Sequence, residues 1–123
     1  MKDEIERKPE ELRERTKRYA LAIIRLYSSL SKEMVSQVLG RQMLRSGTSV
    51  GAQYREAIRA KSKADFVSKI EGALQELEET RYWLELLAES SKVEQDSLGH
   101  LHRETEELLS ILTVIAKKAK VKS

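Results

Sequence analysis

The segment "RQMLRSGTSVGAQYREA", residues 41–57, combines glycines, serines and arginines, which are residue types that bind phosphate or build nucleophile turns. A P-loop requires Gly-x-x-x-x-Gly-Lys-Ser/Thr between a strand and a helix, and this segment has neither the lysine nor a preceding strand. Gly47 to Gly51 matches the letters of a Gly-x-Ser-x-Gly nucleophile elbow, but that elbow is a strained strand-to-helix turn and no strand accompanies it. We therefore expect no catalytic residue here and a non-enzymatic protein.

The metal-binding residue types give no better pattern. The chain has no cysteine, and its two histidines, His100 and His102, lie two residues apart, so they point to different sides of a helix. Di-iron helical bundles use Glu-x-x-His on two helices, and neither histidine has a glutamate three residues earlier. We expect no metal site and no cofactor.

A helical projection divides the opening segment and the residues after it into two faces. At 100° per residue, four arginines fall on one narrow line, the arginine stripe: Arg41, Arg45, Arg55 and Arg59. Small residues lie on the packing side, where we expect contacts with neighbouring helices: Ser46, Gly47, Val50 and Gly51. Each glycine inside a helix costs about 1 kcal/mol relative to alanine, which a close helix approach can offset.

The arginine stripe is suited to contact the phosphates of RNA or DNA. Its 18 residues of helix span about 27 Å, enough for several phosphates, and Lys61 and Lys63 extend the surface. Residues 25–63 hold eight basic and two acidic side chains, whereas residues 64–112 hold four basic and twelve acidic ones. The basic half of the chain therefore favours a nucleic-acid partner.

Ion pairing is the alternative use of the same arginines. Four glutamates share one face of the third predicted helix: Glu71, Glu78, Glu85 and Glu89. This acidic face could meet the arginine stripe across two helices or across a subunit interface. The protein would then be a structural or adaptor oligomer without nucleic-acid binding, and both alternatives remain open on the sequence.

Apolar residues recur at helical spacing in four segments, while turn residues are few. Pro9 suits the first turn of a helix, and Ser31 can cap a second helix. The segment "SKAD", Ser62 to Asp65, has the form of a capping box that would begin a third helix. The segment "SSKVEQDS" supplies the turn before the fourth helix. The predicted fold is an all-α, antiparallel, up-down-up-down four-helix bundle in one domain, residues 1–123, with helices at about 10–29, 31–60, 63–89 and 94–118.

The third predicted helix is apolar on more than one side. Trp83 and Leu86 fall off its main apolar face, which predicts a second interface and self-association into a homo-oligomer. The longest uncharged apolar run, residues 19–24, is too short to cross a bilayer. We expect a cytoplasmic protein with no membrane partner.

The stretch from Leu44 to Leu87 resembles a bacterial four-helix-bundle family that includes proteins encoded in intervening sequences of large-subunit ribosomal RNA genes. The resemblance is carried by Arg45-Ser46, Ser49-Val50, the junction from Ser62 to Phe66, and "ETRYWLELL". It implies a four-helix bundle that is often assembled as a homopentameric barrel. A related branch, the accessory variability proteins of diversity-generating retroelements, partners a reverse transcriptase and binds nucleic acid through a basic surface.

Overall fold

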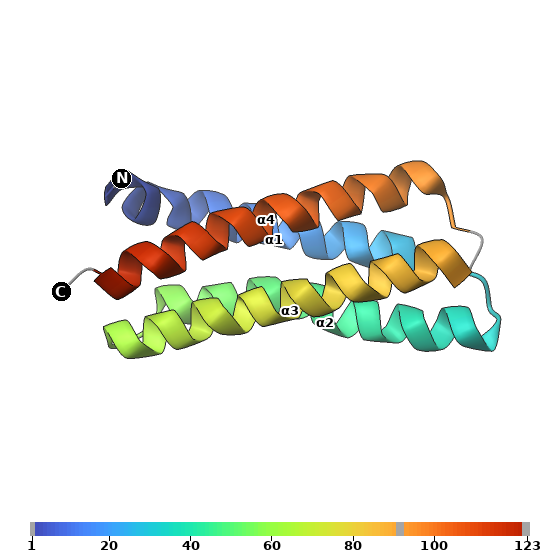
Figure 1. The fold of residues 1–123 in the computed structure, drawn as a ribbon, viewed down its shortest axis with the longest axis horizontal. Coiled ribbons are helices and arrows are strands. Elements are labelled where there is room, and N and C mark those ends of the chain that lie inside the picture. The colour runs from blue at the N-terminus through green and yellow to red at the C-terminus, as the bar shows by residue number, and fades with distance from the viewer. Residues whose placement is uncertain (1, 91–92, 122–123) are drawn as a thin grey trace.

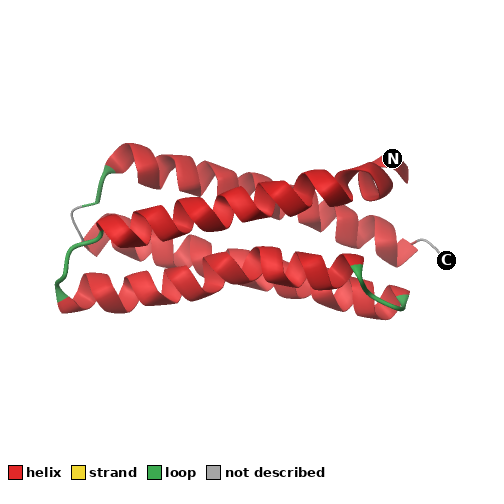
Figure 2. Ribbon diagram, turned by 180° about the vertical axis from the view of Figure 1, so that it is seen from behind, coloured by secondary structure: helices red, strands yellow, loops and turns green. Residues whose placement is uncertain are grey.

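The computed structural model describes residues 2–90 and 93–121, which form four helices joined by short connections (Figure 1). The helices are α1 (Lys2–Ser29), α2 (Met34–Ile58), α3 (Lys63–Ser90) and α4 (Gln95–Val121). The described residues contain no strand. Figure 2 shows that the α2–α3 connection lies at one end of the bundle and the other two connections at the opposite end. The predicted all-α fold of four helices is therefore confirmed.

Side-chain pairs between helices show how neighbours run past one another. Arg45 of α2 pairs with Glu79 of α3, and Glu56 further along α2 pairs with Lys69 earlier in α3. Residue numbers thus rise along α2 as they fall along α3. Among the four pairs of neighbouring helices, α2 and α3 pack most closely and α1 and α4 most loosely.

Two helix starts differ from the sequence prediction. Pro9 lies inside α1 and not in its first turn, because α1 begins at Lys2. Ser31 lies before α2, which begins at Met34 with Glu33 at its N-cap. The Ser31 hydroxyl instead accepts a hydrogen bond from the Glu33 backbone N–H at 3.0 Å, so it stabilises the turn that precedes the helix.

The other predicted junctions agree more closely. The Ser62 hydroxyl oxygen accepts a hydrogen bond from the Asp65 backbone N–H at 3.0 Å, which is the first half of the predicted capping box. In the turn predicted before α4, residues 91–92 lie outside the described residues, and α4 itself begins at Gln95. Ser62 therefore fixes where α3 begins.

Glycines allow α1 and α2 to approach closely. A Cβ atom at Gly47 would lie 2.8 Å from Ile23 Cγ1, and a Cβ atom at Gly51 would lie 3.2 Å from Thr16 Oγ1. Both glycines are buried, as are Ser46 and Val50. The side of α2 with small residues thus faces the interior, and its glycines make room for α1.

Buried hydroxyl groups join the four helices near the middle of the bundle. Tyr19 of α1 bonds Thr105 of α4 at 2.6 Å, and Ser46 of α2 bonds Thr80 of α3 at 2.7 Å. Thr105 donates its one hydroxyl proton to the Leu101 carbonyl, so Tyr19 is the donor in the first pair. In the second pair each hydroxyl also lies near a carbonyl of its own helix, Thr80 at 2.8 Å and Ser46 at 3.4 Å, so either can be the donor. Burial raises the pKa of Tyr19, while the nearby Thr105 and Thr80 hydroxyls oppose that rise.

Replacement of Gly47 by alanine tests the close approach of α1 and α2. The new methyl group would lie 2.8 Å from Cγ1 of Ile23, a fully buried core residue that would have to shift. Overpacking costs about 1–3 kcal/mol and the gain in helix propensity returns about 1 kcal/mol, so we expect the free energy of unfolding to fall by up to about 2 kcal/mol. Urea denaturation followed by circular dichroism measures the change.

The matched control is Gly99→Ala in α4. A Cβ atom there would meet only the end of the flexible Arg103 side chain, at 3.5 Å. This substitution should raise the free energy of unfolding by up to about 1 kcal/mol. Equal effects of the two alanines would contradict the close packing at Gly47.

Candidate nucleic-acid interface

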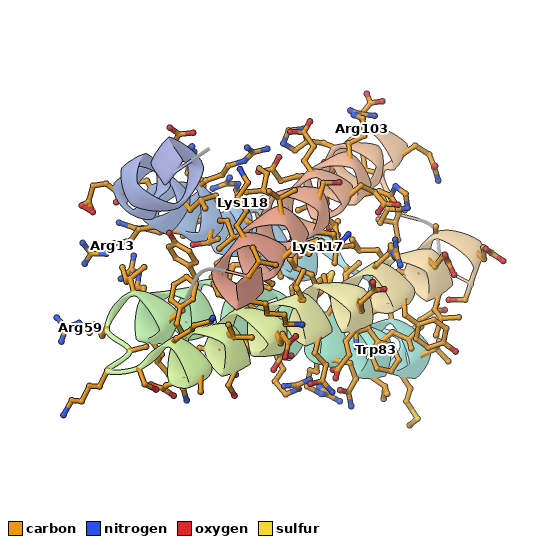
Figure 3. All side chains as sticks on the ribbon, turned by 60° about the vertical axis from the view of Figure 1, so that its left-hand side comes forward. Arg13, Arg59, Trp83, Arg103, Lys117 and Lys118 are labelled. Carbon is orange, nitrogen blue, oxygen red and sulfur yellow. The ribbon has the colours of Figure 1, made fainter. Side chains whose placement is uncertain are left out.

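The four residues of the arginine stripe are all exposed, but they have different surroundings. Arg41, Arg45 and Arg55 lie on α2, whereas Arg59 is the C-cap residue that follows Ile58, because the helix ends before the predicted residue 60. Gly47 faces α1 and Ser46 faces α3, which sets the rotation of α2 about its axis. At 100° per residue, this rotation inclines Arg45 toward α3 and Arg55 toward α1, whereas Arg41 points outward. Figure 3 shows that Arg59 also points away from the bundle. The four arginines of the stripe therefore do not all face the same surroundings.

Arg45 is matched by carboxylates of the same chain. Its Nη2 atom lies 2.6 Å from Glu79 Oε1 and 3.4 Å from Glu76 Oε1. Glu76 is largely covered, with 16% of its side chain exposed. The positive charge of Arg45 is thus balanced across the α2–α3 boundary.

The acidic face expected to meet the stripe is not the one that Arg45 contacts. Glu71 pairs with Lys120 of α4 at 2.6 Å, and Glu78 pairs with Arg81 in its own helix. Glu85 and Glu89 are exposed and line a groove between α3 and α4. The rotation of α3 places Glu76 and Glu79, rather than these four glutamates, beside α2.

Four other basic residues of the surface have no carboxylate partner within residues 10–90 and 93–121. This group comprises Arg41, Arg55, Arg59 and Lys61, and Lys63 lies exposed at the first position of α3. Figure 3 shows Arg59 at the end of the bundle formed by the α2–α3 connection, with Arg13 of α1 at the same end. The unmatched positive charge thus lies mostly at this end of the bundle. Arg41 lies toward the opposite end, in the first half of α2.

Ion pairs at the helix boundaries make a contrast with the stripe. Arg15 Nε lies 2.7 Å from Glu104 Oε2, and this bond raises the pKa of the arginine. Lys69 pairs with Glu56 at 3.0 Å, which raises the pKa of the lysine. The boundaries between helices therefore carry matched charges, while most of the arginine stripe does not.

A shallow groove between α1 and α2 adds a residue that the sequence analysis did not identify. Lys17 and Arg55 both line this groove, whose volume is about 390 Å³ and whose lining also includes Gly51 and Ala52. Lys17 could have been found from the sequence only if the side of α2 that faces α1 had been known. The groove extends the basic surface onto α1.

Trp83 and Leu86, the predicted interface residues, are both half-buried. Trp83 packs against the core, and its Nε1 atom is buried with no hydrogen-bond partner in the described part of the chain. Its neighbour Tyr82 is more exposed, at 52%, with ring centroids 5.3 Å apart. Trp83 (Figure 3) is therefore partly a core residue of its own subunit.

Exposed apolar residues at the start of α2 adjoin this region. Val38 lies seven residues before Arg45, and Leu86 lies seven residues after Glu79. Because α2 and α3 run in opposite directions and Arg45 pairs with Glu79, Val38 and Leu86 lie at the same level of the bundle. The apolar patch is defined as Val38, Tyr82, Trp83 and Leu86, and Met34 and Val35 lie exposed nearby in sequence.

The segment from Gly47 to Gly51 lies in the middle of α2. The Ser49 hydroxyl donates to the Arg45 carbonyl at 2.7 Å, and no described residue has a positive φ angle. The segment is therefore neither a nucleophile elbow nor a P-loop. Over the described ranges, there is no cluster of three or more side chains that could hold a metal ion, and no helix is long and apolar enough to span a bilayer.

Comparisons with known proteins agree with this architecture. The family described as 23S rRNA-intervening sequence protein matches residues 10–114. A crystal structure from Bacteroides thetaiotaomicron VPI-5482, described as a protein with unknown function from the S23 ribosomal protein family, is 37% identical with a TM-score of 0.82. That similarity covers 89% of this chain and 98% of the other. A comparison with curated proteins found no match.

Proposed function

This chain belongs to the 23S rRNA-intervening sequence protein family, and from that premise we propose that it is an oligomeric helical protein that binds RNA or DNA through α2. The binding surface consists of Arg41, Arg55 and Arg59, extended by Lys17 and Lys61. One observation carries the proposal: these side chains are exposed and unmatched in the described residues, although carboxylates match the cations at the helix boundaries.

Guanidinium groups suit phosphate because they donate two parallel hydrogen bonds to its oxygens. Arg41 lies inside α2 and Arg59 at its C-cap, 18 residues apart, a separation of about 27 Å that can cover several phosphates of one strand. Lys17 broadens the surface across the α1–α2 groove. The surface is thus long and narrow, as a contact with a nucleic-acid backbone requires.

Aromatic side chains do not take part in this surface. Tyr54 of α2 is buried, and Tyr27 of α1 is half-buried with its hydroxyl donating to Gln37 at 2.9 Å. Bases therefore have no aromatic ring on which to stack here. The proposed contact is with the sugar-phosphate backbone, independent of sequence.

A second candidate function is a structural or adaptor oligomer without a nucleic-acid ligand. The pairing of Arg45 with Glu79 supports it, since one arginine of the stripe already meets a carboxylate. In this alternative, Arg41, Arg55 and Arg59 would pair with carboxylates of another subunit. The two functions differ in what charge reversal does to the assembly.

The binding proposal is tested with the double substitution Arg55→Glu and Arg59→Glu. We expect the wild-type protein to bind a fluorescent RNA or DNA duplex at low salt and to lose affinity steeply as salt rises. The double variant should lose at least about tenfold in affinity, because two phosphate contacts become repulsions. Fluorescence anisotropy at several salt concentrations gives the affinities, and native mass spectrometry gives the oligomeric state.

The matched control is Arg103→Glu, a charge reversal on exposed α4 that Figure 3 shows well away from Arg59. It should leave the affinity nearly unchanged. Dissociation of the oligomer by the double substitution would favour the adaptor function. No affinity of the wild type at low salt would refute nucleic-acid binding.

Self-association is proposed to use the apolar patch. Val38 and Tyr82 are 46% and 52% exposed, and the half-buried Leu86 lies at the level of Val38. Burial of such side chains between subunits contributes about 25 cal/mol per Å² of apolar surface. The resemblance to homopentameric relatives supports a closed ring of copies.

Leu86→Glu tests this interface. A buried charge at a subunit contact should dissociate the oligomer while each chain remains helical. Sedimentation velocity reports the mass and circular dichroism the helix content. Val114→Glu, which places the same charge at an exposed apolar site of α4, should leave the oligomer intact, and a wild-type protein that is monomeric at micromolar concentration would overturn the proposal.

A further inference from the structure

The loose packing of α1 against α4 leaves open space on a different side of the bundle from the α1–α2 groove. Two adjoining grooves there have volumes of about 550 and 380 Å³. They share Ala22 and Arg25 of α1 with His100 and Leu101 of α4. The small side chain of Ala22 and the apolar Leu101 form a floor, and basic groups stand around it.

The register of the two helices brings three of these basic groups to one stretch of groove. Arg15 pairs with Glu104, and Tyr19 bonds Thr105. His100 is one turn before Glu104 on α4, so it lies opposite the part of α1 between Arg18 and Arg25. These two arginines are seven residues apart, about 10 Å along the same face of the helix.

The charges of the groove are not balanced at this point. Arg15 is matched by Glu104 and Glu107, each at 2.7 Å. By contrast, three exposed groups have no ion-pair partner among the described residues: Arg18, Arg25 and His100. Two arginines and a histidine without a carboxylate surround the same space.

The carboxylates that line these grooves lie away from the three basic groups or already pair with another side chain. Glu94 and Asp96 line only the part of the groove near the start of α4. Glu94 accepts hydrogen bonds from the backbone N–H and the hydroxyl of Ser97, which lower its pKa. Glu104 borders the opposite part but is held by Arg15. The stretch between them therefore favours an anion.

We propose that this stretch, the α1–α4 anion site, binds a phosphomonoester through Arg18, Arg25 and His100. A terminal phosphate presents three oxygens, and each guanidinium can donate two hydrogen bonds to it while the imidazole donates one. Arginine side chains that begin about 10 Å apart can converge from both sides on a group between them. The phosphate would lie above Ala22, opposite the buried core.

The adjoining part of the groove suits the remainder of a nucleotide. It contains the apolar Leu26 together with Ser29 and Ser97, whose hydroxyl protons are engaged within the chain but whose oxygens can accept hydrogen bonds. The phosphomonoester could belong to a free 5′-nucleotide or to the 5′ end of a nucleic-acid strand, and the chemistry of recognition is the same. The site uses none of the residues of the proposed binding surface on α2, so either can fail without the other.

Titration of the full chain with adenosine 5′-monophosphate, adenosine and inorganic phosphate tests the α1–α4 anion site. Calorimetry should show adenosine 5′-monophosphate binding at least about tenfold more tightly than adenosine, because only the nucleotide carries the charge. Nuclear magnetic resonance should show the largest shifts at His100 and at the backbone amides of Arg18 and Arg25. Equal affinity for nucleotide and nucleoside, or no binding of either at millimolar concentration, would overturn the proposal.

Substitutions at exposed positions leave the fold intact and localise the effect. The pair Arg18→Gln and Arg25→Gln should lower nucleotide affinity at least about tenfold, whereas Arg103→Gln, which borders the groove between α3 and α4 instead, should not. An equal loss in both variants would overturn the proposal. An oligonucleotide with a 5′-phosphate distinguishes a strand end from a free nucleotide as the natural ligand. If it binds more tightly than the same oligonucleotide with a 5′-hydroxyl, the ligand is a strand end. If the two bind equally while the nucleotide still binds, the ligand is a free nucleotide.

Discussion

The rotation of α2 about its own axis is the constraint on which the rest of the structure depends. Two consecutive residues fix it: Ser46 bonds Thr80 of α3 at 2.7 Å, and Gly47 packs against Ile23 of α1. Successive residues of a helix differ by about 100°, close to the angle between two neighbours in a four-helix bundle. Because both contacts are buried, the opposite side of α2 must face outward.

That rotation determines the surroundings of each arginine. Arg45 is inclined toward α3 and reaches Glu79, whereas Arg55 is inclined toward α1, where it shares a groove with Lys17. Arg41 and Arg59 point away from both neighbours. The same stripe therefore contains one arginine that stabilises a helix boundary and three that are available to a ligand.

The sequence predicts much of the fold, because apolar periodicity and capping residues act within one helix. The four helices and the role of Ser62 follow from such local patterns. The start of α2 does not, since Ser31 and Glu33 compete for the capping position and only the turn before the helix decides between them.

The candidate site is less predictable, because a helical projection cannot show how one helix is rotated relative to another. The projection of the third helix identified Glu71 and Glu78, but the packed helices place Glu79 beside Arg45. For the same reason, a helical projection does not identify Lys17, although Lys17 lines the groove with Arg55. Which surfaces meet is a property of the packed bundle and not of any one segment.

In the proposed binding mode, the unmatched arginines contact phosphate and the matched one does not. The most direct measurement is the salt dependence of nucleic-acid affinity for two single variants, Arg59→Ala and Arg45→Ala, compared with the wild type. Because Arg59 is unmatched and Arg45 is not, the slope of log affinity against log salt should decrease by about one for Arg59→Ala and stay unchanged for Arg45→Ala. Equal slopes for the two variants, or a larger decrease for Arg45→Ala, would contradict it.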